Sequence, residues 1–91
     1  MKFLRWTADL AELPPPIEAV YTEVDTRGDV HREVGVDGIG NVVYRKPSSD
    51  PKWGRDGLFY SIDLPAPAEE VSAERFDALW DDMAGAQRSS P

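Results

Sequence analysis

Three alternating segments joined by two glycine-containing turns most constrain the fold of this chain. The segments are 17–24 (IEAVYTEV), 30–36 (VHREVGV) and 41–46 (NVVYRK), and the turns are 25–29 (DTRGD) and 37–41 (DGIGN). A period of two places successive side chains on opposite faces of a strand, and short glycine-containing turns join antiparallel neighbours. The sequence therefore predicts an antiparallel meander.

The flanking segments predict further strands and one helix. KFLRWT (2–7) alternates and predicts a first strand, and LFYSIDL (58–64) predicts a last one. Residues 65–70 (PAPAEE) are expected to link the sheet to a helix that Ser72 caps. Val71 and Phe76 have the spacing of a hydrophobic staple at the start of that helix.

The helix carries an apolar stripe with the spacing of one helical face. Its members are Phe76, Leu79, Trp80 and Met83, and Gly85 is the expected stop. The fold class predicted is α+β: an antiparallel meander sheet of four to five strands with one C-terminal helix packed on a face. Because 91 residues suffice for one core, residues 1–84 are expected to form a single domain and residues 85–91 a flexible tail.

Composition excludes several classes of site. The chain has no cysteine, which rules out a disulfide, a thiolate zinc site and a cysteine nucleophile. No apolar run approaches the roughly 18 residues of a membrane span. The first residues do not read as a secretory signal, since Arg5, Asp9 and Glu12 interrupt any apolar core. We therefore expect a cytoplasmic protein.

His31 is the only histidine and lies among carboxylates and arginines. A catalytic histidine needs a nucleophile to activate or a carboxylate to orient it. Glu33 lies two residues on, where the two side chains are expected to form a solvated pattern on an exposed strand face. No second histidine or cysteine supplies further metal ligands. We predict that His31 lies on the sheet surface and that the chain has no catalytic residue, metal or cofactor; a small enzyme with perturbed carboxylates near His31 is one alternative.

Charge indicates what kind of partner the chain has. The net charge is −7, and residues 61–91 carry seven Asp or Glu against two Arg. This balance disfavours direct contact with nucleic acid and favours a basic protein partner, although an acidic surface also serves solubility. The acidic side chains expected to contact a partner are those of the predicted helix: Glu74, Asp77, Asp81 and Asp82. Trp53, in the basic and aromatic loop 46–57, is expected either to pack on the sheet or to anchor a partner.

Three segments together resemble one family. VYTEVDTRGDVHREV (20–34) resembles a hairpin of the form Y-S-E-[LIV]-D-x-x-G-x-E-x-R-x-V-E, and SAERFDALW (72–80) resembles S-x-E-E-F-E-x-[LV]-W. KFLRWT is similar to the R-Y-[LI]-x-V-x-W start of the same set. The set is a family of small bacterial domains of unknown function. The resemblance runs from Lys2 to Trp80, departs between Pro47 and Pro67, and implies no catalytic residues.

Family members of this size and acidity look like immunity proteins, which are antidotes encoded beside secreted bacterial toxins. We therefore expect a protein that binds and neutralises a toxin domain, of a basic nuclease type, through its acidic surface. The alternative is a general interaction or accessory module that adds a peptide strand to an exposed sheet edge. Salt separates the two, since main-chain pairing resists salt better than contacts between surface charges.

Overall fold

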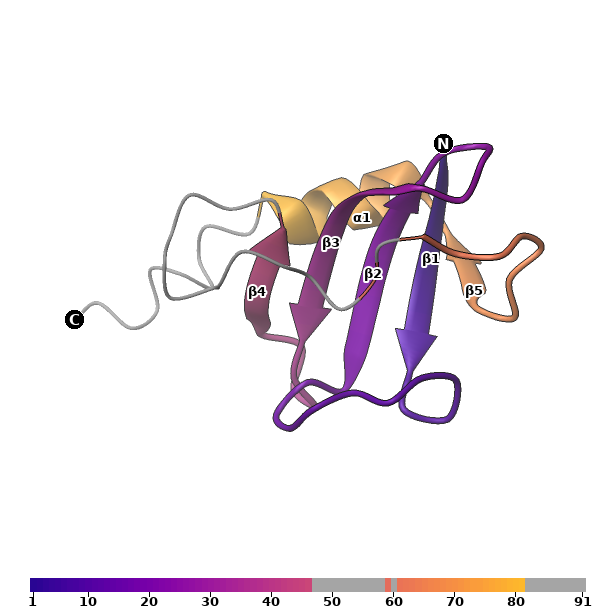
Figure 1. The fold of residues 1–91 in the computed structure, drawn as a ribbon. Coiled ribbons are helices and arrows are strands. Elements are labelled where there is room, and N and C mark those ends of the chain that lie inside the picture. The colour runs from indigo at the N-terminus through magenta and orange to yellow at the C-terminus, as the bar shows by residue number, and fades with distance from the viewer. Residues whose placement is uncertain (47–58, 60, 82–91) are drawn as a thin grey trace.

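The computed structural model describes residues 1–46, 59 and 61–81. Its one antiparallel sheet has five strands in the order β4-β3-β2-β1-β5, and one helix packs on it (Figure 1). The elements are β1 (Lys2–Thr7), β2 (Ala19–Val24), β3 (Val30–Val36), β4 (Val42–Lys46), β5 (Glu69–Val71) and α1 (Ala73–Trp80). The predicted α+β class is confirmed, and the predicted strands match β1 to β4 within two residues.

The fifth strand is not the one that the sequence predicted. Among the described residues of 58–64, only Ser61 pairs, in an isolated antiparallel bridge with Asp29. The strand beside β1 is instead β5, which lies in the segment expected to be a linker and to precede the helix. The apolar residues Phe59, Ile62 and Leu64 pack on a face of the sheet and do not extend it. For the described residues of 58–64 the prediction of a last strand was therefore wrong, because their apolar side chains cover the sheet.

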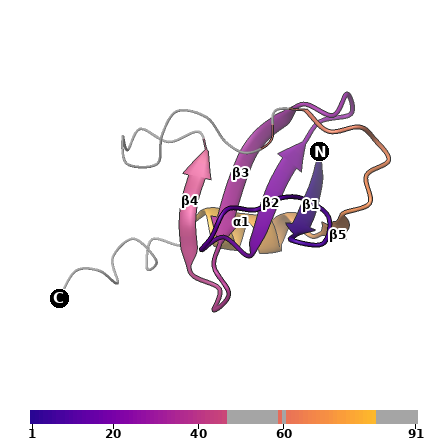
Figure 2. The same cartoon turned by 60° about the horizontal axis from the view of Figure 1, so that its bottom comes forward.

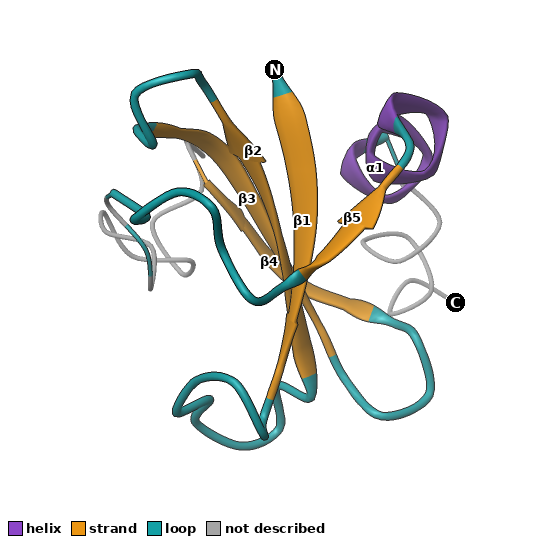
Figure 3. Ribbon diagram, turned by 90° about the vertical axis from the view of Figure 1, so that its right-hand side faces the viewer, coloured by secondary structure: helices purple, strands orange, loops and turns teal. Residues whose placement is uncertain are grey.

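Both faces of the sheet are covered. Figure 3 shows α1 on one side of the strands, and in Figure 2 the helix lies behind them. On the helix side, Phe76 is fully buried in a cluster with Tyr21 and Val34. On the other side, residues of the connections 8–18 and 61–68 pack on a cluster that contains Trp6. Two covered faces explain why consecutive residues of β2 are buried.

The helix begins and ends as local chemistry dictates. The Ser72 Oγ accepts the N–H of Arg75 at 3.1 Å, which confirms the predicted cap. α1 ends at Trp80, before the predicted stop at Gly85, and its last turn contains no basic residue. Arg45 of β4 donates from Nη1 to the Trp80 carbonyl at 2.7 Å, so a cation from the sheet occupies the negative end of the helix. Met83 and Gly85 lie outside the described residues.

Both turns of the meander have the same hydrogen-bond pattern. In each, an aspartate Oδ1 accepts the N–H groups two and four residues ahead: Asp25 accepts from Arg27 and Asp29 at 2.9 and 3.1 Å, and Asp37 accepts from Ile39 and Asn41 at 3.0 and 2.8 Å. The fourth residue is a glycine with positive φ, 91° at Gly28 and 88° at Gly40. One turn design therefore serves both ends of β3.

The two glycines differ in one respect, which yields a prediction. A Cβ at Gly28 would lie 2.0 Å from the carbonyl oxygen of Ile62, whereas a Cβ at Gly40 would meet nothing within 4 Å. Each substitution places an alanine in a backbone conformation with positive φ, which lowers the free energy of unfolding by about 1–2 kcal/mol. Gly28→Ala is expected to lower the free energy of unfolding by roughly 1–3 kcal/mol more than Gly40→Ala, because it also overpacks the site. Urea denaturation measures both; equal losses would show that Ile62 does not pack on the turn.

Candidate functional site

The acidic residues predicted on the helix share one exposed face. Glu74, Asp77 and Asp81 are exposed, whereas the apolar stripe of α1 faces the sheet. Their spacing of three and four residues aligns them along the helix, and we call these three side chains the acidic ridge. The structure therefore brings together three of the predicted contact residues. Asp82 and Trp53 lie outside the described part of the chain.

One member of the ridge is partly neutralised. Arg32 of β3 donates from Nη2 to Asp77 at 3.1 Å, and it binds both carboxylate oxygens of Glu23, at 2.9 and 2.7 Å. The hydrogen bonds from Arg32 lower the pKa of Glu23. The same guanidinium lies 4.9 Å from the centroid of the Phe76 ring. Asp77 thus belongs to a contact that ties α1 to the sheet.

The other two members of the acidic ridge have no cationic partner among the described residues. Within the described ranges, neither Glu74 nor Asp81 forms an ion pair. The neighbouring arginine on the helix, Arg75, turns toward the sheet and donates to the Tyr21 hydroxyl at 3.1 Å. Arginines therefore bind the helix to the sheet, while carboxylates face outward. The sequence did not lead us to predict that the arginines face the sheet and the carboxylates face outward. One signal was present: alternation along β3 places Arg32 on the same face as Val34, which is the face that the helix covers.

Glu33 is the largest departure from the sequence prediction, which placed it on a solvated face. Its side chain is buried, with the residue only 1% exposed. The carboxylate accepts the Tyr44 hydroxyl and, at 3.0 Å, the N–H of Phe59. Burial, together with the hydrogen bond to Glu33, raises the pKa of Tyr44. The prediction was wrong because connections, which periodicity does not place in space, cover this face.

The prediction that His31 lies on the surface is confirmed, but its neighbour is a different carboxylate. The side chain is 48% exposed, and Nε2 lies 2.9 Å from Asp25 Oδ2. The hydrogen bond with His31, aided by the N–H groups of Asp29 and Arg27, lowers the pKa of Asp25 to about 2. Because Asp25 organises the first turn of the meander, His31 contributes to the geometry of that turn.

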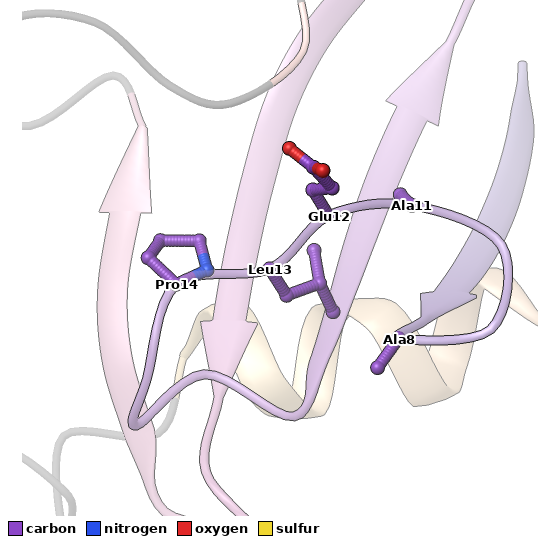
Figure 4. Close-up of a pocket in the computed structure, with 5 residues that line it drawn as sticks. All are labelled: Ala8, Ala11, Glu12, Leu13 and Pro14. Atoms are coloured by element: carbon purple, nitrogen blue, oxygen red, sulfur yellow. The ribbon is translucent and has the colours of Figure 1, made fainter.

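Two of the hollows in the described surface contain few titratable side chains. One, of about 330 Å³, is lined by Met1, Lys2, Asp25, Thr26 and Leu64. The other, of about 490 Å³, lies in the loop after β1 (Figure 4) and is lined by Ala8, Ala11, Glu12, Leu13 and Pro14. Glu12 is its one titratable side chain. Among the described residues, no group of three His, Asp or Glu side chains is arranged to hold a metal ion, and no helix is long and apolar enough to cross a membrane. The acidic ridge is therefore the best-defined candidate site.

Comparison with protein-family models, with curated proteins and with solved structures found no match. The resemblance to a family of small bacterial domains consequently stays a prediction.

The buried carboxylate predicts a difference between two tyrosines. Tyr44→Phe removes a hydroxyl that donates to buried Glu33, so we expect the free energy of unfolding to fall by about 1–3 kcal/mol. Tyr21→Phe is the matched control: Tyr21 is also buried, but its hydroxyl accepts from Arg5 and Arg75 in hydrogen bonds that are only partly buried. Its expected loss is about 0.5–1.5 kcal/mol. Urea denaturation compares the two variants, and a smaller loss for Tyr44→Phe would contradict the buried network.

The turn predicts a pH dependence. Since the pKa of Asp25 is depressed in the folded state, to about 2, its stabilisation is present above the unfolded pKa near 3.8 and is lost as pH falls through about 2. His31→Ala removes the main cause, so the pKa of Asp25 is expected to rise toward its ordinary value. Carboxyl carbon chemical shifts, followed by NMR from pH 5 downward, measure this change. An unchanged Asp25 titration in the variant would assign the low pKa to the turn N–H groups alone.

Proposed function

We propose that this protein is an immunity-type protein, which neutralises a toxin domain by placing the acidic ridge of α1 on a basic surface of that domain. The supporting observation is that Glu74 and Asp81 are exposed and form no ion pair with any residue that the structure describes, while the neighbouring Arg75 is engaged with Tyr21. The proposed partner is a nuclease-type toxin domain, because a surface that binds phosphates must carry cations. The proposal places this encounter in the cytoplasm.

The contacts that hold α1 on the sheet favour a binding role. Phe76 is fully buried, and Arg32 joins Asp77 to β3, so the helix is already ordered before any partner arrives. A preordered surface loses little conformational entropy on binding. Exposed like charges also attract an oppositely charged partner over a Debye length of about 8 Å at physiological salt, which raises the association rate. These properties suit an inhibitor that must reach its target quickly.

The partner itself is the first test of this proposal. Tagged protein is used to capture binding proteins from the native host at low salt, and the column is then washed at high salt. The expected result is a stoichiometric protein that contains a toxin domain and is released by salt, because the contact is between charges. Co-expression with that domain should then restore growth. A captured partner without toxic activity would refute the immunity role.

Charge reversal tests the surface. Glu74→Lys combined with Asp81→Lys is expected to weaken binding of the captured domain by about tenfold or more at low salt, since each close charge pair contributes more than about 1 kcal/mol. The two changes have opposite effects on the helix dipole, so their effects on stability should largely offset. Binding is measured by calorimetry, and folding is checked by circular dichroism.

The matched control makes the same change of net charge elsewhere. Glu12→Lys with Asp63→Lys alters two exposed carboxylates, both in connections outside α1. This variant should bind within about twofold of the unaltered protein, apart from a general effect of net charge that salt screens. Equal weakening in both variants would show that the ridge is not the contact surface.

A further inference from the structure

β5 forms an edge of the sheet whose outer side is open to another chain. It pairs with β1 alone, with Val71 opposite Phe3 and Glu69 opposite Arg5. Among the described residues, no other backbone hydrogen bond engages β5. Figure 1 shows β5 at the right-hand edge of the sheet. The structure describes the chain on both sides of β5, from Ser61 to Asp81, which is not so for β4, the other edge.

The charges of β5 select what can pair with it. Glu69 and Glu70 are both exposed, and as consecutive strand residues they lie on opposite faces of the sheet. A second copy of this chain, paired edge to edge, would place glutamates against glutamates, and like charges opposite one another destabilise a strand pair. The edge therefore opposes self-association, which is a common way to protect a sheet edge. A strand that carries cations would meet attraction on both faces.

We propose that β5 binds an extended segment of a partner protein with the sequence pattern apolar–cation–cation, running antiparallel to β5. In this register the apolar residue lies opposite Val71, on the helix side, where Val71 packs against the cluster that contains Phe76. The two cations lie opposite Glu70 and then Glu69. Main-chain hydrogen bonds supply the attraction common to all strands, and the side chains supply selectivity.

Two features prepare the edge for this role. β5 is held at its C-terminal end and along one side, since Ser72 directly after it caps α1 and β1 pairs along its inner side. Within the part of the chain that the structure describes, Glu70 forms an ion pair with Lys2 alone, at 3.8 Å, and the two side chains are 64% and 56% exposed. Such a long and exposed pair contributes little, so an incoming cation replaces it at low cost.

This inference does not rest on the proposed toxin partner. The ridge acts through charge alone, whereas the edge needs main-chain N–H and C=O groups on the partner. A failure of the ridge variants to affect toxin binding would leave the edge untouched, and a failure at the edge would leave the ridge untouched.

A short synthetic peptide tests the edge directly. The probe is acetyl-Thr-Val-Lys-Lys-Thr-amide, titrated into the full ¹⁵N-labelled chain at about 0.15 M salt, where surface charges are partly screened. Amide shifts are expected to change in β5 and its neighbour β1, and an outward-facing amide of β5 should exchange more slowly with solvent. The matched control is the same peptide with alternate backbone nitrogens methylated, which keeps every charge and removes donors. It should bind at least about tenfold more weakly, as expected for the loss of two hydrogen bonds.

Protein variants complete the test. Glu69→Lys with Glu70→Lys is expected to weaken peptide binding by about fivefold or more, and the neutral pair Glu69→Gln with Glu70→Gln by less, in line with cross-strand charge pairs. The ridge variant, Glu74→Lys with Asp81→Lys, should bind the peptide within about twofold of the unaltered chain. The proposal is overturned if the peptide leaves β5 unperturbed up to millimolar concentration, if the methylated peptide binds equally well, or if the shifts map to α1.

Discussion

The burial of Phe76 against the sheet is the contact on which the rest of this structure depends. Its ring is fully buried and lies 5.1 Å from the ring of Phe3, measured between centroids. Burying a side chain of this size stabilises a domain by roughly 1.5–3 kcal/mol. Arg32 lies against the same ring and binds Asp77, so an apolar contact and a charged one fix the helix together. Every exposed residue of α1 takes its direction from this packing.

The face of the sheet opposite α1 is covered in a different way. There the connections cover the sheet, and the cover includes polar contacts: the Ile62 N–H donates to the Gly28 carbonyl at 2.7 Å, and the Phe59 N–H donates to Glu33. The buried side chain of Glu33 is tolerated because donors satisfy its oxygens, since burying a polar group without such a partner costs free energy. The hydrogen bonds of Phe59 and Ile62 thus fix where these two residues lie on the sheet.

The charges of the protein are sorted by this architecture. Arginines from β3, β4 and α1 lie at the junction of helix and sheet, where Arg32, Arg45 and Arg75 each have a partner. Carboxylates consequently dominate the outer side of α1 and the edge at β5. The two proposed binding surfaces differ in the interaction that they offer. The acidic ridge attracts a partner through its charge, whereas the edge at β5 adds directional main-chain hydrogen bonds.

The sequence by itself determined β1 to β4, the two turns, the cap at Ser72 and the helix stripe, because each depends on spacing or on contacts between near neighbours. The acidic ridge was predictable for the same reason. Only the tertiary structure decided that Glu33 is buried, that 61–64 covers the sheet, and that β5 completes it. These depend on which segments meet across long stretches of chain: Phe59 and Glu33 are 26 residues apart, and Arg32 and Asp77 are 45 apart. Alternation along a strand predicts which side chains are buried, but the segments that cover them are known only from the packed structure.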